Sequence, residues 1–311
     1  MLSRIALQIA LVVVIAFSHG AATAARLNVV TTTEDLAAIA REVGGDLVEV
    51  TPLARGYQDP HFVDAKPSYL VRLSKADLFI LVGRELEVAW APALVNNARN
   101  ARILPGSRGY VDVSKGIEML EVPDVVTRAA GDIHPYGNPH FWLDPSNGAR
   151  IAETLRDAFS DARPAMRDTF AARSADFKAR LEARQREWES RAGAMGLRGL
   201  PVVSYHRSWP YFARAFGLEV IDFVEPKPGV PPTAKHIQEL EARMKERSVR
   251  LLMVEPYFDA KLPQKVARET GAALVVLPPS VGAEPEIRTY FDLFDRQLAL
   301  LEEAIGKKGG S

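Results

Sequence analysis

The chain has 311 residues, of which 47% are hydrophobic and 25% charged, which is typical of a packed globular protein with room for two domains. Basic and acidic residues both number 39, so the formal net charge is zero and nothing indicates a nucleic-acid partner. The absence of cysteine excludes disulfides, thiolate metal ligands and cysteine nucleophiles.

The first 25 residues have the pattern of a secretory signal peptide. Arg4 is followed by an uncharged, mostly apolar run over residues 5–17 and then by small residues, with an A-x-A pattern in Ala22-Thr23-Ala24. A membrane anchor is the alternative, but a spanning helix needs about 20 apolar residues. We expect export with cleavage near Ala24. Because there is no cysteine to carry a lipid, we expect the mature protein to be periplasmic.

Short β-branched runs alternate with helical segments along the rest of the chain. The first half predicts strands at residues 27–31, 48–53, 78–82 and 109–113, and helices such as 33–43 and 67–74. The second half predicts strands at residues 201–205, 219–223, 250–254 and 273–277. Strands that alternate with helices form parallel sheets. The predicted fold is therefore α/β, with two lobes of parallel sheet flanked by helices.

A long amphipathic helix is predicted between the lobes, over residues 165–192, with a length of about 42 Å. Its apolar residues recur at steps of four or seven and share one face, at Met166, Phe170, Phe177, Leu181 and Trp188. A coiled-coil dimer is the alternative, but Ser174 interrupts the stripe, and we expect a monomer. The predicted organisation is a signal peptide (1–25), an N-terminal metal-binding lobe (26–160), a spine helix (161–196) and a C-terminal metal-binding lobe (197–311).

Three histidines occupy loops where a cleft between two such lobes would form. Ligands of open parallel sheets bind beyond the carboxyl ends of the strands, and His61 and His206 both follow predicted strands there. His140 lies in a turn between Pro139 and Pro145. Three neutral imidazoles suit zinc and leave a fourth position for a carboxylate or water. The histidines are far apart in sequence, so separate, hydrogen-bonded surface histidines are the alternative.

Proline directly precedes two of these histidines, in Asp59-Pro60-His61 and in Asn138-Pro139-His140. Proline fixes its own φ and holds the residue before it extended, so a stiff backbone would aim each imidazole. Metal–ligand distances vary by only about 0.2 Å, so a backbone that holds each imidazole in a fixed direction suits a metal site.

Four ordered motifs resemble the zinc/manganese-binding periplasmic receptors of ABC transporters (cluster A-I). They are Asp59-Pro60-His61, Asn138-Pro139-His140-Phe141-Trp142-Leu143-Asp144-Pro145, Tyr205-His206 and Val254-Glu255-Pro256. The resemblance covers essentially the whole mature chain. It implies that His61, His140 and His206 ligate the metal and that an inner-membrane ABC permease is the partner. In that family the third position is often glutamate in manganese receptors and histidine in zinc receptors. His206 therefore favours Zn²⁺ over Mn²⁺ or Fe²⁺, in agreement with the suitability of imidazole for zinc.

The sequence departs from the family pattern in two places. Many members supply a fourth ligand, an aspartate after the last strand, where this chain reads Leu277-Pro278-Pro279-Ser280. Water or Glu284, from the following loop, is expected instead. Many zinc receptors carry a histidine-rich loop before the second histidine, whereas residues 115–137 contain only His134. We expect His134 either to assist metal capture or to be an exposed loop histidine.

Other polar residues near the predicted site have more than one interpretation. Asp64 could accept a hydrogen bond from a ligand imidazole or serve as an acid at the start of the helix near Pro67. Glu255 is expected to pair locally, and His236 to be a surface or capping residue. The proline-dense loop at 225–232 could be a lid rim, a docking surface or a plain connection.

The leading functional hypothesis is a zinc receptor that delivers metal to a permease. Uptake requires neutral imidazoles, so affinity should fall as the pH drops through about 6.5. A zinc hydrolase is the rival from another class, since three histidines and an open position can activate water. The chain has no H-E-x-x-H helix and no serine nucleophile elbow, and we expect no enzymatic activity. A metal-coordinating adhesion or sensor protein of the same fold is a third hypothesis.

Overall fold

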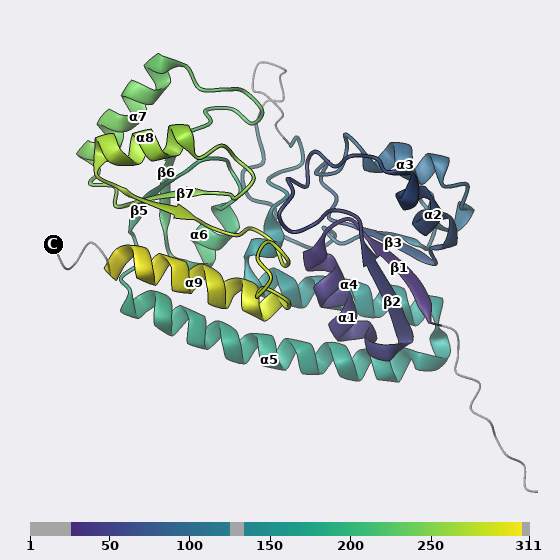
Figure 1. Ribbon diagram of the computed structural model, residues 1–311. Helices are drawn as coiled ribbons and strands as arrows, with labels where there is room; N and C mark the ends of the chain where they lie inside the picture. Colours follow the sequence, from purple (N-terminus) through teal and green to yellow (C-terminus); the bar gives the residue numbers. More distant parts are fainter. Residues whose placement is uncertain (1–25, 125–133, 307–311) are drawn as a thin grey trace, which may run out of the picture.

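The computed structural model describes residues 26–124 and 134–306, and places two lobes over one long helix (Figure 1). The predicted signal peptide at residues 1–25 lies outside the described residues. None of the helices in the two described stretches combines the length and the apolar composition needed to cross a bilayer.

The first lobe contains a four-stranded parallel sheet in the order β2-β1-β3-β4. Its elements are β1 (Leu27–Thr31), α1 (Glu34–Gly44), η1 (Gly45–Leu47), β2 (Val48–Pro52), α2 (Pro67–Lys75), β3 (Leu78–Leu81), α3 (Ala91–Asn97), η2 (Ala101–Ile103) and β4 (Tyr110–Asp112). Successive side chains of a strand point to opposite faces. In β3, Ile80 therefore joins the core cluster shared with α1, while Phe79 joins the cluster beneath α2 and α3.

The second lobe contains a matching parallel sheet in the order β6-β5-β7-β8. Its elements are β5 (Pro201–Ser204), α6 (Pro210–Phe216), β6 (Glu219–Phe223), α7 (Ala234–Glu246), β7 (Leu251–Val254), α8 (Lys261–Thr270), β8 (Ala273–Val276) and α9 (Tyr290–Gly306). All eight predicted strands are confirmed, and their ends shift by one residue at most. The predicted fold class, two α/β lobes with a long joining helix, is also confirmed.

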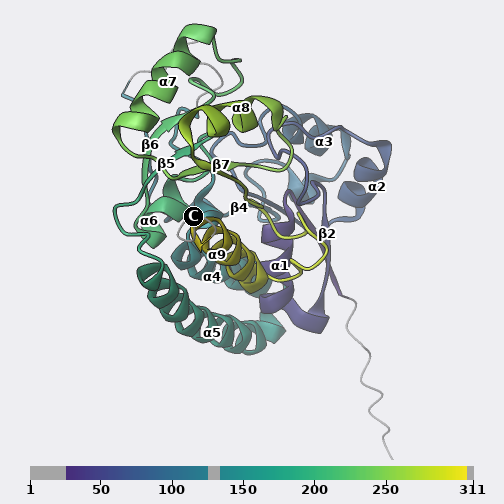
Figure 2. The ribbon, with the colours of Figure 1, turned by 60° about the vertical axis from the view of Figure 1, so that its left-hand side comes forward.

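Between the lobes the chain forms η4 (Phe141–Leu143), α4 (Pro145–Ala162), η5 (Pro164–Met166) and the spine helix α5 (Arg167–Ala194). The predicted stripe on α5 is buried from Phe170 to Trp188, and Ser174 fits in it by donating to the carbonyl of Ala152. Helices α1, α4, α6 and α9 all pack on α5. Figure 2 shows α6 and α1 near opposite ends of this helix. The chain's own helices therefore occupy the face that a coiled-coil dimer would need.

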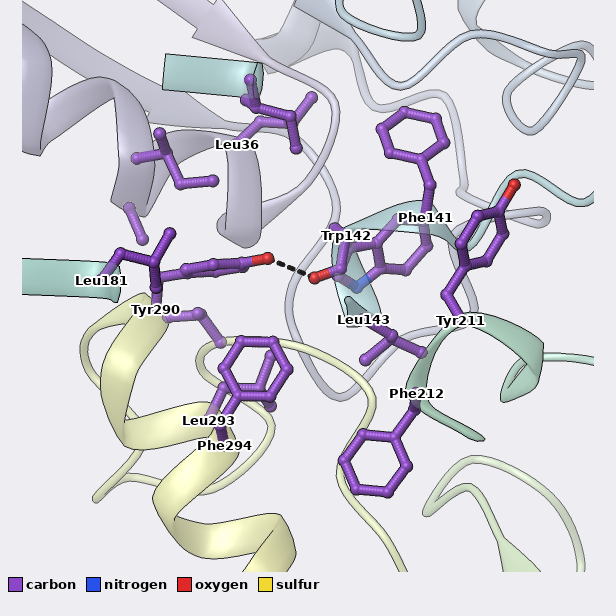
Figure 3. Packing of buried hydrophobic residues seen from close by; sticks show 14 of the residues in the cluster. Leu36, Phe141, Trp142, Leu143, Leu181, Tyr211, Phe212, Tyr290, Leu293 and Phe294 are labelled. Carbon is purple, nitrogen blue, oxygen red and sulfur yellow. Dashed lines mark hydrogen bonds between the residues drawn. The ribbon is translucent and has the colours of Figure 1, made fainter. Parts of the chain in front are cut away.

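One buried cluster runs through both lobes, from Leu27 in β1 to Leu301 in α9. The segment Phe141–Leu143 lies at its centre, where the Tyr290 hydroxyl donates to the carbonyl of Trp142 (Figure 3). The Trp142 indole in turn donates to the carbonyl of Pro279 over 2.9 Å. Because this core crosses the lobe boundary, the exact domain limits remain a prediction.

Candidate metal centre

His61 is oriented by the aspartate two residues before it. Its Nδ1 lies 2.7 Å from Asp59 Oδ1, and its backbone N–H donates to the same oxygen over 2.9 Å. A carboxylate only accepts hydrogen bonds, so Nδ1 carries the ring hydrogen and Nε2 keeps a free lone pair. Burial opposes ionisation of Asp59, but the side-chain and backbone hydrogen bonds from His61 hold the pKa of Asp59 below its ordinary value.

His140 is oriented in the same way by Asn138. The Asn138 Oδ1 lies 3.0 Å from both the backbone nitrogen and the Nδ1 of His140. The Asn138 amide nitrogen donates to the carbonyl of Arg207 over 2.7 Å, which directs the oxygen toward the histidine and connects the two lobes. Side-chain oxygens of Asx residues commonly bond the backbone two residues on. The Asx-Pro-His pattern shared by the two sites therefore signals both acceptors in the sequence, in addition to the stiffness that its proline gives.

Asp144 fixes the segment that carries His140 through two contacts. One carboxylate oxygen of Asp144 accepts from the N–H of Ser146 over 2.9 Å and caps α4, and the other pairs with Arg214 of α6 at 3.0 Å. The buried Asp144 thus ties the start of α4 to the second lobe. Capping and ion pairing together fix the position of the turn that presents His140.

His206 follows β5 directly and is oriented by Glu225. Its Nδ1 lies 2.6 Å from Glu225 Oε2, while Glu225 Oε1 accepts from the N–H of Gly229 over 2.9 Å. The Ser204 hydroxyl donates to the carbonyl of His206 over 2.8 Å. The loop at 225–232 therefore supplies the acceptor that fixes the His206 tautomer. This role is not visible in the sequence, because the two residues follow different strands.

The three predicted histidines converge at the boundary of the lobes. One ring nitrogen from each of His61, His140 and His206 lies within 4.8 Å of the others. Their ring centres are 5.2, 5.5 and 5.7 Å apart. For imidazoles on one tetrahedral zinc ion, Zn–N bonds of about 2.0–2.1 Å place the ring centres about 5 Å apart. The arrangement therefore fits a single ion, with a small inward movement of the rings.

His140 has the most constrained environment of the three. Its side chain is 1% exposed, and its Nε2 makes no hydrogen bond within the described residues. Burial, followed by the charges of His61 and His206, lowers the pKa of His140 well below 6.5. The ring therefore stays neutral, with its free lone pair directed at the other histidines. That is the form of imidazole that binds metal.

A fourth histidine lies against the same cluster. His134 is partly buried, and its Nε2 lies 3.2 Å from the Nε2 of His61. Burial and the charges of His61 and His206 lower the pKa of His134 to about 3. The interpretation of His134 as an exposed loop histidine is therefore wrong.

Three other residues considered in the sequence, Glu284, Asp64 and His236, have roles outside the cluster of His61, His140 and His206. Glu284, the proposed alternative to water as fourth ligand, is paired with Arg296 of α9 at 2.6 Å. Asp64 is exposed, and Asp59 takes the role considered for it. The ring of His236 bonds the carbonyl of Phe223 at 3.0 Å and lies outside the cluster.

Glu255 is fully buried at the end of β7, where we predicted a local partner. Ser208 and Trp209 lie beside its carboxyl group as donors, although among the described residues none of these contacts has the full geometry of a hydrogen bond. Burial raises the pKa of Glu255 to about 8, so the side chain is protonated at neutral pH. Ser208 and Trp209 are therefore the local partners of Glu255, and loss of charge avoids the cost of a buried carboxylate.

A cavity of about 540 Å³ opens beside the cluster and is lined by both lobes. His61, His134 and His206 reach it, whereas His140 lies behind them. Three acidic residues also line it, namely Asp59, Glu85 and Glu225. Carboxylates at the mouth of a site raise the local concentration of cations, so the cavity suits the entry of a metal ion.

The two-lobed fold, the spine helix and the interlobe histidines define a metal-binding substrate-binding protein of an ABC transporter. The chain belongs to the family described as zinc-uptake complex component A, periplasmic, whose model matches residues 29–304. Members of this family are binding proteins and not enzymes, which removes the hydrolase hypothesis.

Relatives and solved structures support this assignment. The chain is 24% identical to the metal ABC transporter substrate-binding lipoprotein ScbA of Streptococcus cristatus, over 91% of this chain and 90% of that protein. It is 23% identical to the manganese ABC transporter substrate-binding lipoprotein PsaA of Streptococcus mitis, over 97% of each. It is 22% identical to the zinc-binding lipoprotein AdcA of Streptococcus pneumoniae, over 91% of this chain but 57% of that protein. A crystal structure of ZnuA superposes with a TM-score of 0.73 and 26% identity, covering 90% of this chain and 98% of that one.

Proposed function

We propose that this protein binds zinc and delivers it to an inner-membrane ABC permease. The observation that carries the proposal is the convergence of three imidazoles, each with Nδ1 bonded to an acceptor, on one point between the lobes. An acceptor at Nδ1 leaves the Nε2 lone pair available for a metal ion. Imidazole donors suit zinc, whereas manganese prefers carboxylate and carbonyl oxygen.

A manganese or iron receptor of the same fold is the second candidate. It is favoured by the similarity to PsaA, which is named for manganese, and by the three carboxylates of the cavity. Two of these carboxylates, Asp59 and Glu225, already accept from ligand imidazoles, so they orient nitrogen donors rather than offering oxygen to the ion. The donor set therefore supports zinc.

A periplasmic location is part of the proposal. The pattern of residues 1–25 supports export, and the relatives are named as lipoproteins while the family is described as periplasmic. The permease as partner follows from the ABC transporters for which these relatives are named. We expect the protein to act as a monomer.

Calorimetry of the purified mature chain against a competing chelator tests the proposal. We expect one zinc per molecule, much weaker binding of manganese, and a strong loss of zinc affinity in His140→Ala. His236→Ala is the matched control, because it removes a histidine that lies outside the cluster. Equal affinity for zinc in wild type and His140→Ala, or tighter binding of manganese than of zinc, would contradict the proposal.

A further inference from the structure

We propose that His134 is the fourth protein ligand, so that the metal is held by four imidazole nitrogens without a carboxylate or water. This inference rests on the proposed function and adds the donor set of the site. Its basis is the position of His134, whose Nε2 points at the Nε2 of His61 across the mouth of the cluster.

The distance between the two nitrogens matches the edge of a metal tetrahedron. On a zinc ion with bonds of about 2.0–2.1 Å, two ligand nitrogens lie about 3.3 Å apart. The Nε2 atoms of His134 and His61 are 3.2 Å apart, and their ring centres are 5.2 Å apart. His134 lies outside the group of three nitrogens within 4.8 Å of one another, and its ring centre is 6.5 Å from that of His140, so it would move inward by about 1.5 Å to complete a tetrahedron.

Nearby carboxylates are already engaged by other groups. Asp59 and Glu225 accept from the Nδ1 atoms of His61 and His206, and Glu284 pairs with Arg296. Using any of them as a ligand would break an existing contact. For Asp59 and Glu225 this contact fixes the tautomer of a histidine, and for Glu284 it is the ion pair with Arg296 on α9. The contact of His134 with His61 joins two ring nitrogens, one of which donates its hydrogen to the other, and a metal ion would take the place of that hydrogen.

The backbone around His134 is built to present it. The N–H of Gly137 donates to the carbonyl of His134 over 3.1 Å and closes a tight turn, in which Gly137 has a φ of +99°. A Cβ at Gly137 would lie 2.7 Å from the Cβ of Met119, so this turn requires glycine. The N–H of Asn138 then donates to the carbonyl of Leu120 over 2.8 Å. The turn thus attaches His134 to the same rigid segment that carries His140.

His134 differs from His140 in facing the cavity. His134 lines the cavity, while His140 is almost fully buried behind the other rings. His134 would therefore bind a metal ion that enters from the cavity on the side of the ion that faces the cavity. Four nitrogen donors around a small tetrahedral site favour zinc and exclude manganese, which needs oxygen donors and more ligands. His134 would thus determine metal specificity and retain the ion.

The test compares wild type, His134→Ala and the control His236→Ala, each loaded with zinc or with cobalt as a spectroscopic probe. X-ray absorption at the zinc edge should show the outer-shell scattering of four imidazole rings in wild type and His236→Ala, and of three rings in His134→Ala. The visible absorption bands of the cobalt-loaded His134→Ala protein should also differ from those of cobalt-loaded wild type, whereas those of His236→Ala should not. We expect His134→Ala to bind zinc about 10- to 100-fold more weakly than wild type, which is the loss typical of removing a hydrogen-bond partner of a metal ligand. We also expect it to release zinc to a chelator faster.

A second variant, His134→Asp, tests the specificity role while keeping a ligand in place. It should lower the ratio of zinc affinity to manganese affinity, because a carboxylate oxygen donor replaces an imidazole nitrogen. If His134→Ala keeps the cobalt spectrum, the number of imidazole ligands and the zinc affinity of wild type, the inference is wrong while the zinc receptor stands. If wild type itself fails to bind zinc, both proposals fail.

Discussion

The backbone N–H of Val281 donates a 2.9 Å hydrogen bond to the buried carboxyl group of Asp35. The hydroxyl of Ser280 donates to the other oxygen of the same group. These bonds join the loop after β8 to α1, which belongs to the first lobe. The neighbouring Pro279 accepts from Trp142, so the segment where the family pattern places a metal-ligating aspartate is here fastened between the lobes.

Ser280→Ala should destabilise the folded protein by about 1–3 kcal/mol, because it leaves a buried oxygen of Asp35 without its partner. Urea denaturation of the metal-free protein measures this change. Ser74→Ala is the control, since its hydroxyl bonds the carbonyl of Val71 at an exposed position. A loss no larger than that of the control would show that the interlobe contact is not formed in solution.

Removing the acceptors behind the imidazoles should weaken zinc binding by about 10- to 100-fold. Asp59→Ala and Asn138→Ala each delete the oxygen that holds Nδ1 of a predicted ligand. Asp64→Ala removes an exposed aspartate near His61 and should leave the affinity unchanged. Chelator competition at fixed pH compares the three, and equal effects at positions 59 and 64 would refute the assigned orientation of His61.

Stability of the metal-free protein should fall as the pH rises toward 8. Burial raises the pKa of Glu255 to about 8 and that of Glu87 to about 7, from an ordinary value of 4.5. Such carboxyl groups hold their protons more tightly in the native state than in the unfolded chain. Their contribution to stability is complete below pH 4.5 and is lost as the pH rises through about 7 to 8.

Glu255→Gln tests the largest of these contributions. Between about pH 5.5 and 7 it should make the dependence of unfolding free energy on pH less steep by about 1.4 kcal/mol per pH unit, the value for one proton. Urea denaturation at several pH values measures the slope. Glu246→Gln, at an exposed position on α7, controls for loss of a carboxyl group from the chain. An unaltered slope in Glu255→Gln would mean that Glu255 is ionised or hydrated in the native state.

The fold followed from local patterns, whereas the partners of the site did not. Alternating strands and helices predicted both sheets, and the stripe from Phe170 to Trp188 predicted the buried face of α5, because these features repeat within short windows. Glu225 and Asp35 act on residues that other elements bring near, and such contacts follow only from the folded chain. Asp59 and Asn138 were the exceptions, since each stands two residues before the histidine that it orients.

Anomalous diffraction at the zinc edge from crystals of the zinc-loaded mature protein tests the central claim most directly. We predict one strong peak between the lobes, about 2.0–2.1 Å from the Nε2 atoms of His61, His140 and His206. Zinc bound through Nδ1 of any of these residues, or a peak that one of the three rings does not reach, would contradict the account.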